Sequence, residues 1–175
     1  ERASQLIKSF KQVSVDQASE TRRTFNARQY LSEVLLSMNP RLKKTRHEIR
    51  VDCDDNIEID GYPGAFAQII TNLVMNSLVH AFEPDSAGMI DISIHKQADN
   101  IHLTYSDNGR GIPAEHLPKI FDPFFTTKRG CGGTGLGLSV VYNIVVQNFG
   151  GTIACTSEAG QGTTFSVQFP AQGMR

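Results

Sequence analysis

The sequence has few cysteines, no excess of positive charge and no long apolar run, and each of these absences argues against certain classes of site or partner. Cys53, Cys131 and Cys155 are widely spaced, which fits neither a zinc site nor a disulfide framework and indicates a reducing, cytoplasmic setting. Lys and Arg number 17 against 18 Asp and Glu. A nucleic-acid binder usually carries a basic excess, so no nucleic-acid partner is expected. No apolar stretch approaches the roughly 20 residues that span a bilayer.

Length and composition limit the architecture. The chain has 175 residues, of which 39% are hydrophobic and 20% are charged, as in a globular protein rather than a disordered one. This length suffices for one packed domain and is short for two. The sequence opens on Glu1 without an initiator methionine. We therefore expect a fragment of a longer parent, and whether that parent is anchored in the inner membrane stays open.

Hydrophobic periodicity divides the chain into an N-terminal helix at 1–15, a linker at 16–23 and one domain at 24–170. The domain alternates helices with pairs of strands. Helices are predicted at 27–38, 64–82 and 136–149, strands near 25, 49–53, 57–59, 90–94, 101–105, 152–156 and 163–169, and a glycine-rich loop at 107–135. This order predicts an α/β two-layer sandwich, in which a mixed sheet of about five strands packs on about three helices.

A polar stripe runs along the predicted helix at 64–82. Gln68, Asn72, Asn76 and His80 are each four residues apart, so they share one face of a helix that is otherwise apolar. Asparagine is a poor helix former, and two on one face call for a reason. An amide oxygen is a suitable ligand for a phosphate-bound Mg²⁺. The alternative is that these amides bond neighbouring backbone groups or face solvent.

Two short motifs follow predicted strands. Asp107 ends a strand and is followed by Gly109 and Gly111. A carboxylate there can accept a hydrogen bond from an exocyclic amine such as that of adenine, and the glycines allow the backbone to approach a flat base. The alternative is a plain turn. Thr163, in the last hairpin, would place its hydroxyl beside the same base or simply belong to the hairpin.

The loop between these motifs is rich in aromatic, cationic and glycine residues. Residues 121–129 hold three phenylalanines, which either anchor a mobile lid or join the core, and two cations that either reach phosphates or face solvent. Residues 130–138 are glycine-rich and open the last predicted helix, where successive backbone N–H groups bind anions. No strand directly precedes Gly130, and no Lys-Ser/Thr pair follows the last glycine, so neither a dinucleotide fingerprint nor a P-loop is predicted.

Taken together, these sequence blocks (the polar stripe, the two motifs that follow strands, and the loop between them) resemble the ATP-binding domain of sensor histidine kinases. That domain belongs to the superfamily of type II topoisomerase ATPases, large heat-shock chaperones and mismatch-repair clamps. The resemblance covers residues 25–169 and implies a Bergerat-type fold with a long ATP lid, and the cofactors ATP and Mg²⁺. It implies a protein-histidine kinase of a two-component system, which passes the ATP γ-phosphoryl group to a histidine on an upstream dimerisation domain. The implied partners are that domain and a response-regulator receiver domain, in a homodimeric parent, with the isolated chain a monomer.

The resemblance also implies roles for single residues. Asn76 corresponds to the Mg²⁺ ligand, with Asn72 close by, and Asp107 to the carboxylate that reads adenine. Asn72, Asn76 and Lys128 are the expected catalytic residues. The expected nucleotide contacts, from the helix stripe through the base loop and lid to the hairpin, are Asn72, Asn76, His80, Asp107, Gly109, Gly111, Ile112, Phe121, Phe125, Thr126, Thr127, Lys128, Gly133, Thr134, Gly135, Leu136, Gly137, Leu138 and Thr163.

Two departures from the family pattern bear on the reaction. Many histidine kinases carry Lys or Arg where this chain has Val79, so the cation must come from elsewhere. The candidates are Lys128, Arg129 and Arg110. Hydrolysing relatives place a Glu where this chain has Asn72, and a neutral amide cannot deprotonate water. This favours phosphoryl transfer over the alternatives, which are an ATPase clamp, a Ser/Thr kinase of the same superfamily and a non-catalytic nucleotide-sensing module.

None of the histidines is a good match to a phosphoacceptor. His47 and the three residues after it superficially resemble an acceptor box, but no proline follows and the segment has a strand pattern. His95, His102 and His116 are expected on the surface. The acceptor is therefore expected upstream of Glu1, and the chain alone is expected to phosphorylate little.

Overall fold

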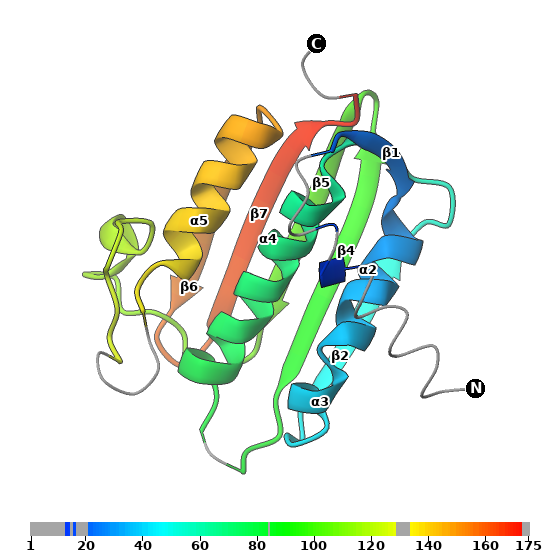
Figure 1. The fold of residues 1–175 in the computed structure, drawn as a ribbon. Helices are drawn as coiled ribbons and strands as arrows, with labels where there is room; N and C mark the ends of the chain where they lie inside the picture. Colours follow the sequence, from blue (N-terminus) through cyan, green and yellow to red (C-terminus); the bar gives the residue numbers. More distant parts are fainter. Residues whose placement is uncertain (1–12, 15, 17–20, 84, 129–133, 173–175) are drawn as a thin grey trace.

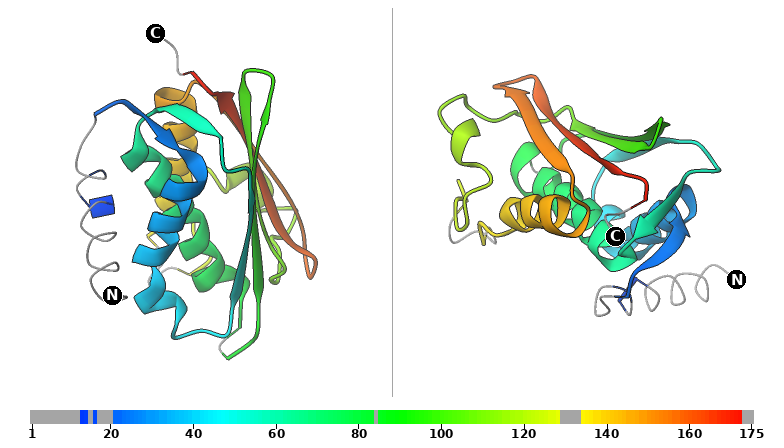
Figure 2. Two further views of the ribbon diagram at one scale, coloured as in Figure 1. Left: turned by 90° about the vertical axis from the view of Figure 1, so that its right-hand side faces the viewer. Right: turned by 90° about the horizontal axis from the view of Figure 1, so that it is seen from above.

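The main sheet has five strands, in the order β2 (Glu48–Cys53), β4 (Met89–Gln97), β5 (Asn100–Asp107), β7 (Gly162–Pro170) and β6 (Thr152–Glu158). The computed structural model describes residues 13–14, 16, 21–83, 85–128 and 134–172. β2 runs parallel to β4, and the other neighbours are antiparallel (Figure 1). The helices form a second layer on one face of this sheet (Figure 2). The predicted two-layer α/β sandwich with a mixed sheet is confirmed.

The helical layer consists of α2 (Ala27–Ser37), α4 (Pro63–Asn76) and α5 (Gly137–Asn143). Shorter helical segments are α3 (Asn39–Leu42), which follows α2, and a 3₁₀ turn at Leu117–Lys119, in the loop before α5. Two of these helices continue as π-helical turns, α4 through Ser77–Ala81 and α5 through Ile144–Asn148. The predicted helices at 64–82 and 136–149 therefore each change their hydrogen-bond spacing near the end. Such π turns are frequent at functional sites. None of the described helices is long and apolar enough to cross a membrane.

The N-terminal part of the domain forms a small sheet of its own. β1 (Arg23–Asn26) pairs antiparallel with β3 (Glu58–Gly61), and Phe25 lies opposite Ile59 in that register. Both side chains are buried, so the pair closes one end of the core. β3 does not pair with β2, its neighbour in sequence. The expected helix at 1–15 lies mostly outside the described residues, but Val13 and Ser14 are helical.

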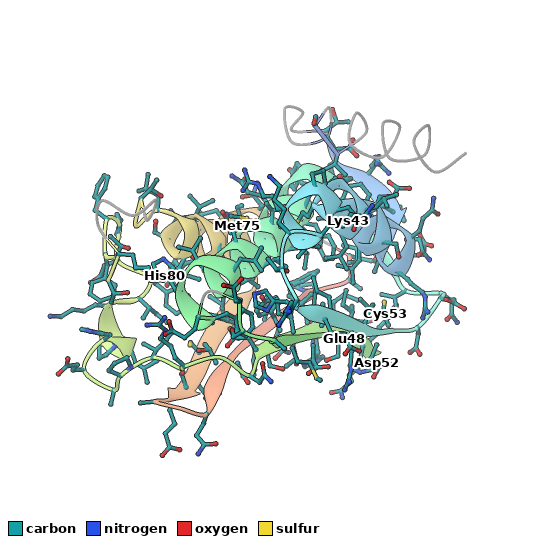
Figure 3. The ribbon with its side chains drawn as sticks, turned by 90° about the horizontal axis from the view of Figure 1, so that it is seen from below. Lys43, Glu48, Asp52, Cys53, Met75 and His80 are labelled. Carbon is teal, nitrogen blue, oxygen red and sulfur yellow. The ribbon has the colours of Figure 1, made fainter. Side chains whose placement is uncertain are left out.

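Burial alternates along the strands because successive side chains point to opposite faces. Ile90, Ile92 and Ile94 of β4 face the helices and are fully or almost fully buried. Figure 3 shows Asp52 and Cys53 on opposite sides of β2, with the carboxylate on the uncovered face. Since α4 buries its apolar face on this sheet, its polar stripe must point elsewhere, beside α5. The segment after His47 is a strand, as its pattern predicts.

Candidate functional site

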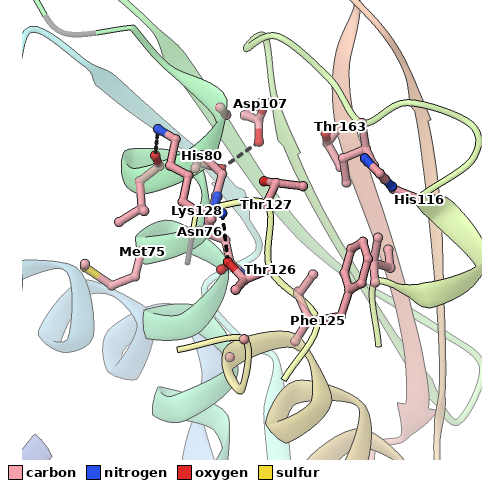
Figure 4. Close-up of a pocket in the computed structure, with 18 of the residues that line it drawn as sticks. Met75, Asn76, His80, Asp107, His116, Phe125, Thr126, Thr127, Lys128 and Thr163 are labelled. Carbon is pink, nitrogen blue, oxygen red and sulfur yellow. Dashed lines mark hydrogen bonds between the residues drawn. The ribbon is translucent and has the colours of Figure 1, made fainter. Parts of the chain in front are cut away.

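A cavity of about 500 Å³ lies where α4, the last residue of β5, the first residues of β7 and the long loop before α5 come together (Figure 4). Residues from blocks far apart in sequence line it. The expected nucleotide contacts among these are Asn72, Asn76, His80, Asp107, Gly111, Ile112, Phe125, Thr126, Thr127, Lys128, Thr134, Gly135, Gly137, Leu138 and Thr163. A cavity of this size falls in the range of small-molecule and cofactor sites, which makes it the candidate site of the chain.

Three of the expected contacts that the structure describes do not line the cavity. Gly109 donates its backbone N–H to an Asp107 carboxylate oxygen at 3.0 Å, so it helps to hold that carboxylate in place without lining the cavity itself. Phe121 packs its ring against Phe165, with a centroid distance of 6.4 Å, and therefore anchors the loop. Leu136 points outward and is 39% exposed. Gly133 lies outside the described residues.

One side of the cavity is formed by two buried polar side chains on neighbouring strands. Asp107 and Thr163 are opposite each other in the β5–β7 register and are 8% and 5% exposed. The Ser77 hydroxyl lies 2.6 Å from an Asp107 carboxylate oxygen and donates to it. Tyr105 donates its hydroxyl to Ser77 at 2.8 Å. Since buried polar groups are costly unless paired, this chain of hydrogen bonds holds the carboxylate at the cavity wall.

The loop after β5 approaches the β6–β7 turn so closely that two positions admit only glycine. Gly111 has φ of +70°, and a Cβ on it would lie 2.0 Å from the Glu158 carbonyl oxygen. Gly162 has φ of +90°, and a Cβ there would lie 2.0 Å from the Asp107 carbonyl oxygen. Left-handed backbone is accessible to glycine at little cost. These glycines therefore bring the strand ends together beside the cavity.

The amides of the polar stripe meet at the start of α5. A Cβ built on Gly137 would lie 3.5 Å from the Asn76 side-chain oxygen and 3.7 Å from that of Asn72. Within the described part of the chain, the buried Nδ2 of Asn76 has no hydrogen-bond partner. A buried polar atom without a partner requires an explanation, and a ligand oxygen in the cavity would satisfy it.

The cationic side chains at the cavity come mainly from the loop. Lys128 donates its ammonium group to the backbone oxygen of Val79, on the π turn after α4 (Figure 4). The charge is therefore placed beside a position whose own side chain is apolar. Arg110 also lines the cavity and pairs with Glu83 at 2.7 Å. Burial, and then the charges of Lys128 and Arg110, lower the pKa of His80, which favours its neutral imidazole.

Several lining residues were not expected from the sequence. His116, expected on the surface, lines the cavity instead, and its ring lies 5.5 Å from that of Phe125. The loop that carries it has no periodicity from which its direction could be inferred. Ser77 directly follows Asn76, but on a regular helix it would lie about 100° away from the polar stripe. The π turn and the nearby Asp107 give it a role that periodicity does not reveal.

The chain belongs to the family of histidine kinase-, DNA gyrase B- and HSP90-like ATPases, whose family model matches residues 61–173. Among curated relatives it is similar to the sensor histidine kinase ZraS of Escherichia coli, with 37% identity over 70% of this chain and 25% of the relative. It is also similar to sporulation kinase A of Bacillus subtilis, with 40% identity over 66% of this chain and 18% of the relative. The chain thus spans a quarter or less of the length of these two relatives.

Solved structures agree with the family. The catalytic domain of histidine kinase ThkA, in a nucleotide-free form, superimposes with a TM-score of 0.75 at 27% identity, covering 86% of this chain and 96% of that domain. A structure of ThkA in complex with the response regulator TrrA gives a TM-score of 0.71 at 25% identity, covering 86% of this chain and 42% of that chain. The fold is therefore that of a histidine kinase catalytic domain.

Proposed function

We propose that this chain is the ATP-binding catalytic domain of a two-component sensor histidine kinase, which passes the γ-phosphoryl group of ATP to a histidine on an upstream dimerisation domain. The observation that carries the proposal is that one cavity has acceptors suited to a base on one side and groups suited to a metal-bound triphosphate on the other. Asp107 and Thr163 offer acceptors that suit the amine of adenine, and Asn76 and Lys128 offer groups that suit a triphosphate with its metal. The family and the names of the relatives support the same function.

The residues at the amide side fit a nucleotide-bound Mg²⁺. Amide oxygens of Asn76 and Asn72 converge beside Gly137, and the unpartnered Nδ2 of Asn76 can donate to a phosphate oxygen. Among the described residues, no group of three or more His, Cys, Asp or Glu side chains is placed to hold a metal ion. The ion would therefore be held mainly by phosphate oxygens and water, with Asn76 as its protein ligand. When bound, Mg²⁺ neutralises charge that develops on the phosphates.

The side chains at the cavity favour transfer over hydrolysis. Phosphoryl transfer depends on positioning and electrostatics, with little covalent work for the protein. Asp107 is the one carboxylate among the described lining residues, and it is already bound by Ser77 and Gly109. Among the described lining residues, no carboxylate lies beside the amides as a base for water, since position 72 is an asparagine. Lys128 supplies the cation that Val79 does not, and Gly135 and Gly137 allow phosphates to approach the backbone.

The wider setting is part of the same proposal. The acceptor histidine lies on a dimerisation domain upstream of the chain, residues 1–15 are the end of its helix, and residues 16–23 link it to the catalytic domain. The parent is a homodimer that phosphorylates a response-regulator receiver domain, and the isolated chain is a monomer. ThkA, a structural relative, is known in complex with a response regulator, which supports this partner. The catalytic domain resides in the cytoplasm, where ATP is available.

The function is tested by incubating the longer parent and the isolated chain with ATP labelled at the γ-phosphate. The parent is expected to acquire label that is lost in acid and kept in base, as phosphohistidine is. The isolated chain is expected to bind the nucleotide and to remain almost unlabelled. Steady release of phosphate by the isolated chain, with no labelled histidine in the parent, would instead establish a hydrolysing ATPase and overturn the proposal.

A further inference from the structure

We propose that Ser157 fixes the direction of the Thr163 hydroxyl and that Ser77 holds the Asp107 carboxylate in place, so that Thr163 and Asp107 both act only as acceptors at the base side of the cavity. A base that presents an amine, such as adenine, is then accepted, and one that presents a carbonyl at the same position, such as hypoxanthine, is rejected. This inference rests on the proposed function, because it takes the base of a nucleotide to lie between β5 and β7. It assigns specificity to two serines outside the expected contacts.

On β5 the direction of each hydrogen bond follows from the atoms present. A carboxylate only accepts, so the single hydrogen of Ser77 must point to Asp107, 2.6 Å away. Tyr105 lies 2.8 Å from Ser77 and must then donate to it. Tyr105 and Ser77 are 0% and 2% exposed, so water does not compete. The second carboxylate oxygen accepts from the Gly109 N–H. Asp107 is thereby held by two donors, and its remaining lone pairs face the cavity.

On β6 and β7 the same reasoning fixes Thr163. Ser157 lies 2.6 Å from the Gly162 carbonyl oxygen, which only accepts, so the single hydrogen of Ser157 is used there. The Ile112 N–H donates to Ser157 at 2.8 Å. The Thr163 hydroxyl lies 3.0 Å from the Ser157 oxygen. Since Ser157 has no second hydrogen to give, Thr163 must be the donor of this bond. Its hydrogen therefore points away from the cavity, and only lone pairs remain for a ligand or a bridging water.

The base side therefore presents only hydrogen-bond acceptors, with Asp107 held in place by Ser77 and the Thr163 hydrogen turned away by Ser157. An amine hydrogen finds an acceptor at Asp107, directly or through water at Thr163. A carbonyl oxygen at the same place meets lone pairs on both residues and stays unpaired. Sites built around a hydrogen bond reject a ligand that cannot make it far more strongly than apolar pockets reject a change in size. Discrimination between an amine and a carbonyl is therefore expected to depend on the serines behind the two contact residues.

The test compares the affinities of the chain for the β,γ-imido analogues of ATP and ITP, whose bases differ in this amine and carbonyl, in Ser157→Ala. Loss of Ser157 lets Thr163 turn its hydrogen toward the cavity. The ratio of ATP to ITP affinity is expected to fall about 10-fold, equivalent to one hydrogen bond, with ITP binding improved. Ser157→Thr keeps the hydroxyl and should keep the ratio. Ser166→Ala removes an exposed hydroxyl from β7 and serves as the matched control.

Ser77 is tested by a pair of variants that separate stability from recognition. Ser77→Ala leaves the buried Tyr105 hydroxyl without an acceptor, so its melting temperature should fall. Adding Tyr105→Phe removes that hydroxyl and should restore much of the stability. ATP affinity is expected to stay about 10-fold low in both variants, because Asp107 still lacks its donor. Recovery of ATP affinity together with stability would show a structural role only.

The possible results separate a failure of this inference from a failure of the proposed function on which it rests. If Ser157→Ala weakens the binding of both nucleotides equally, or if wild type binds both equally well, Ser157 does not set the direction of the Thr163 hydroxyl, and the inference is overturned while ATP binding stands. If the folded wild-type chain binds neither analogue, the proposed function itself is contradicted.

Discussion

Replacing Asp107 with asparagine is expected to lower the affinity of the chain for ATP by about 100-fold or more. Both carboxylate oxygens accept a hydrogen bond, from Ser77 and from the Gly109 N–H. Asparagine has one oxygen, so one of these donors would face an NH₂ group that cannot accept. The amine of adenine would meet a rearranged side chain and lose a hydrogen bond to a charged group. Such bonds contribute about 1.5–3 kcal/mol, and 1.4 kcal/mol is a factor of ten in affinity.

Calorimetric titration with a non-hydrolysable ATP analogue measures the effect of Asp107→Asn. Asp91→Asn makes the same change on the uncovered face of β4, where the carboxylate is exposed, and should leave the affinity unchanged. A thermal melt of each variant checks that the chain is folded. Wild-type affinity in folded Asp107→Asn would show that Asp107 does not contact the base.

Replacing Asn76 with alanine is expected to reduce phosphoryl transfer in the parent by about 100-fold, or about 2.7 kcal/mol in the transition state. Its Nδ2 is buried and has no partner among the described residues, and its side-chain oxygen lies near Gly137. These features fit a ligand of the nucleotide-bound metal, whose charge stabilisation matters most during transfer. The nucleotide itself should still bind, because Asp107 and Thr163 are untouched. The loss should therefore appear as a weaker response to Mg²⁺.

The measurement for Asn76→Ala is the affinity for the ATP analogue with and without Mg²⁺, together with labelling of the parent. In wild type, Mg²⁺ should strengthen binding, and in the variant this gain should largely vanish. Asn148→Ala, an exposed position in the π turn after α5, is the matched control. An unchanged Mg²⁺ response and full labelling in Asn76→Ala would remove this residue from the site.

Much of the fold follows from periodicity. The alternation of Ile90, Ile92 and Ile94 predicts a half-buried strand, and the apolar face of residues 64–82 predicts the helix that covers it. The sequence does not predict that β3 pairs with β1, because Ile57 and Ile59 show the pattern of a strand but do not indicate with which strand it pairs. Strand partners depend on tertiary packing, here on the burial of Phe25 against Ile59, and a local pattern does not contain this information.

The candidate site was predictable where a single motif contains the residues that line it. Asp107, Asn76 and Thr163 each stand in a recognisable block, and the structure brings those blocks to one cavity. What periodicity does not reveal is how the blocks support one another. The hydrogen bonds from Ser77 to Asp107 and from Thr163 to Ser157 join residues from different elements. The Lys128 contact with Val79 spans 49 positions in sequence and depends on the path of the loop.

The central claim is that this cavity binds ATP together with Mg²⁺, and calorimetric titration of the wild-type chain tests it most directly. Three titrations are needed: the non-hydrolysable ATP analogue alone, the analogue with Mg²⁺, and Mg²⁺ alone. We predict one nucleotide per chain, tighter binding with Mg²⁺, and no binding of Mg²⁺ alone, because the described residues hold no cluster of metal-ligating side chains. A folded chain that binds no nucleotide, or that binds Mg²⁺ tightly by itself, would contradict the claim.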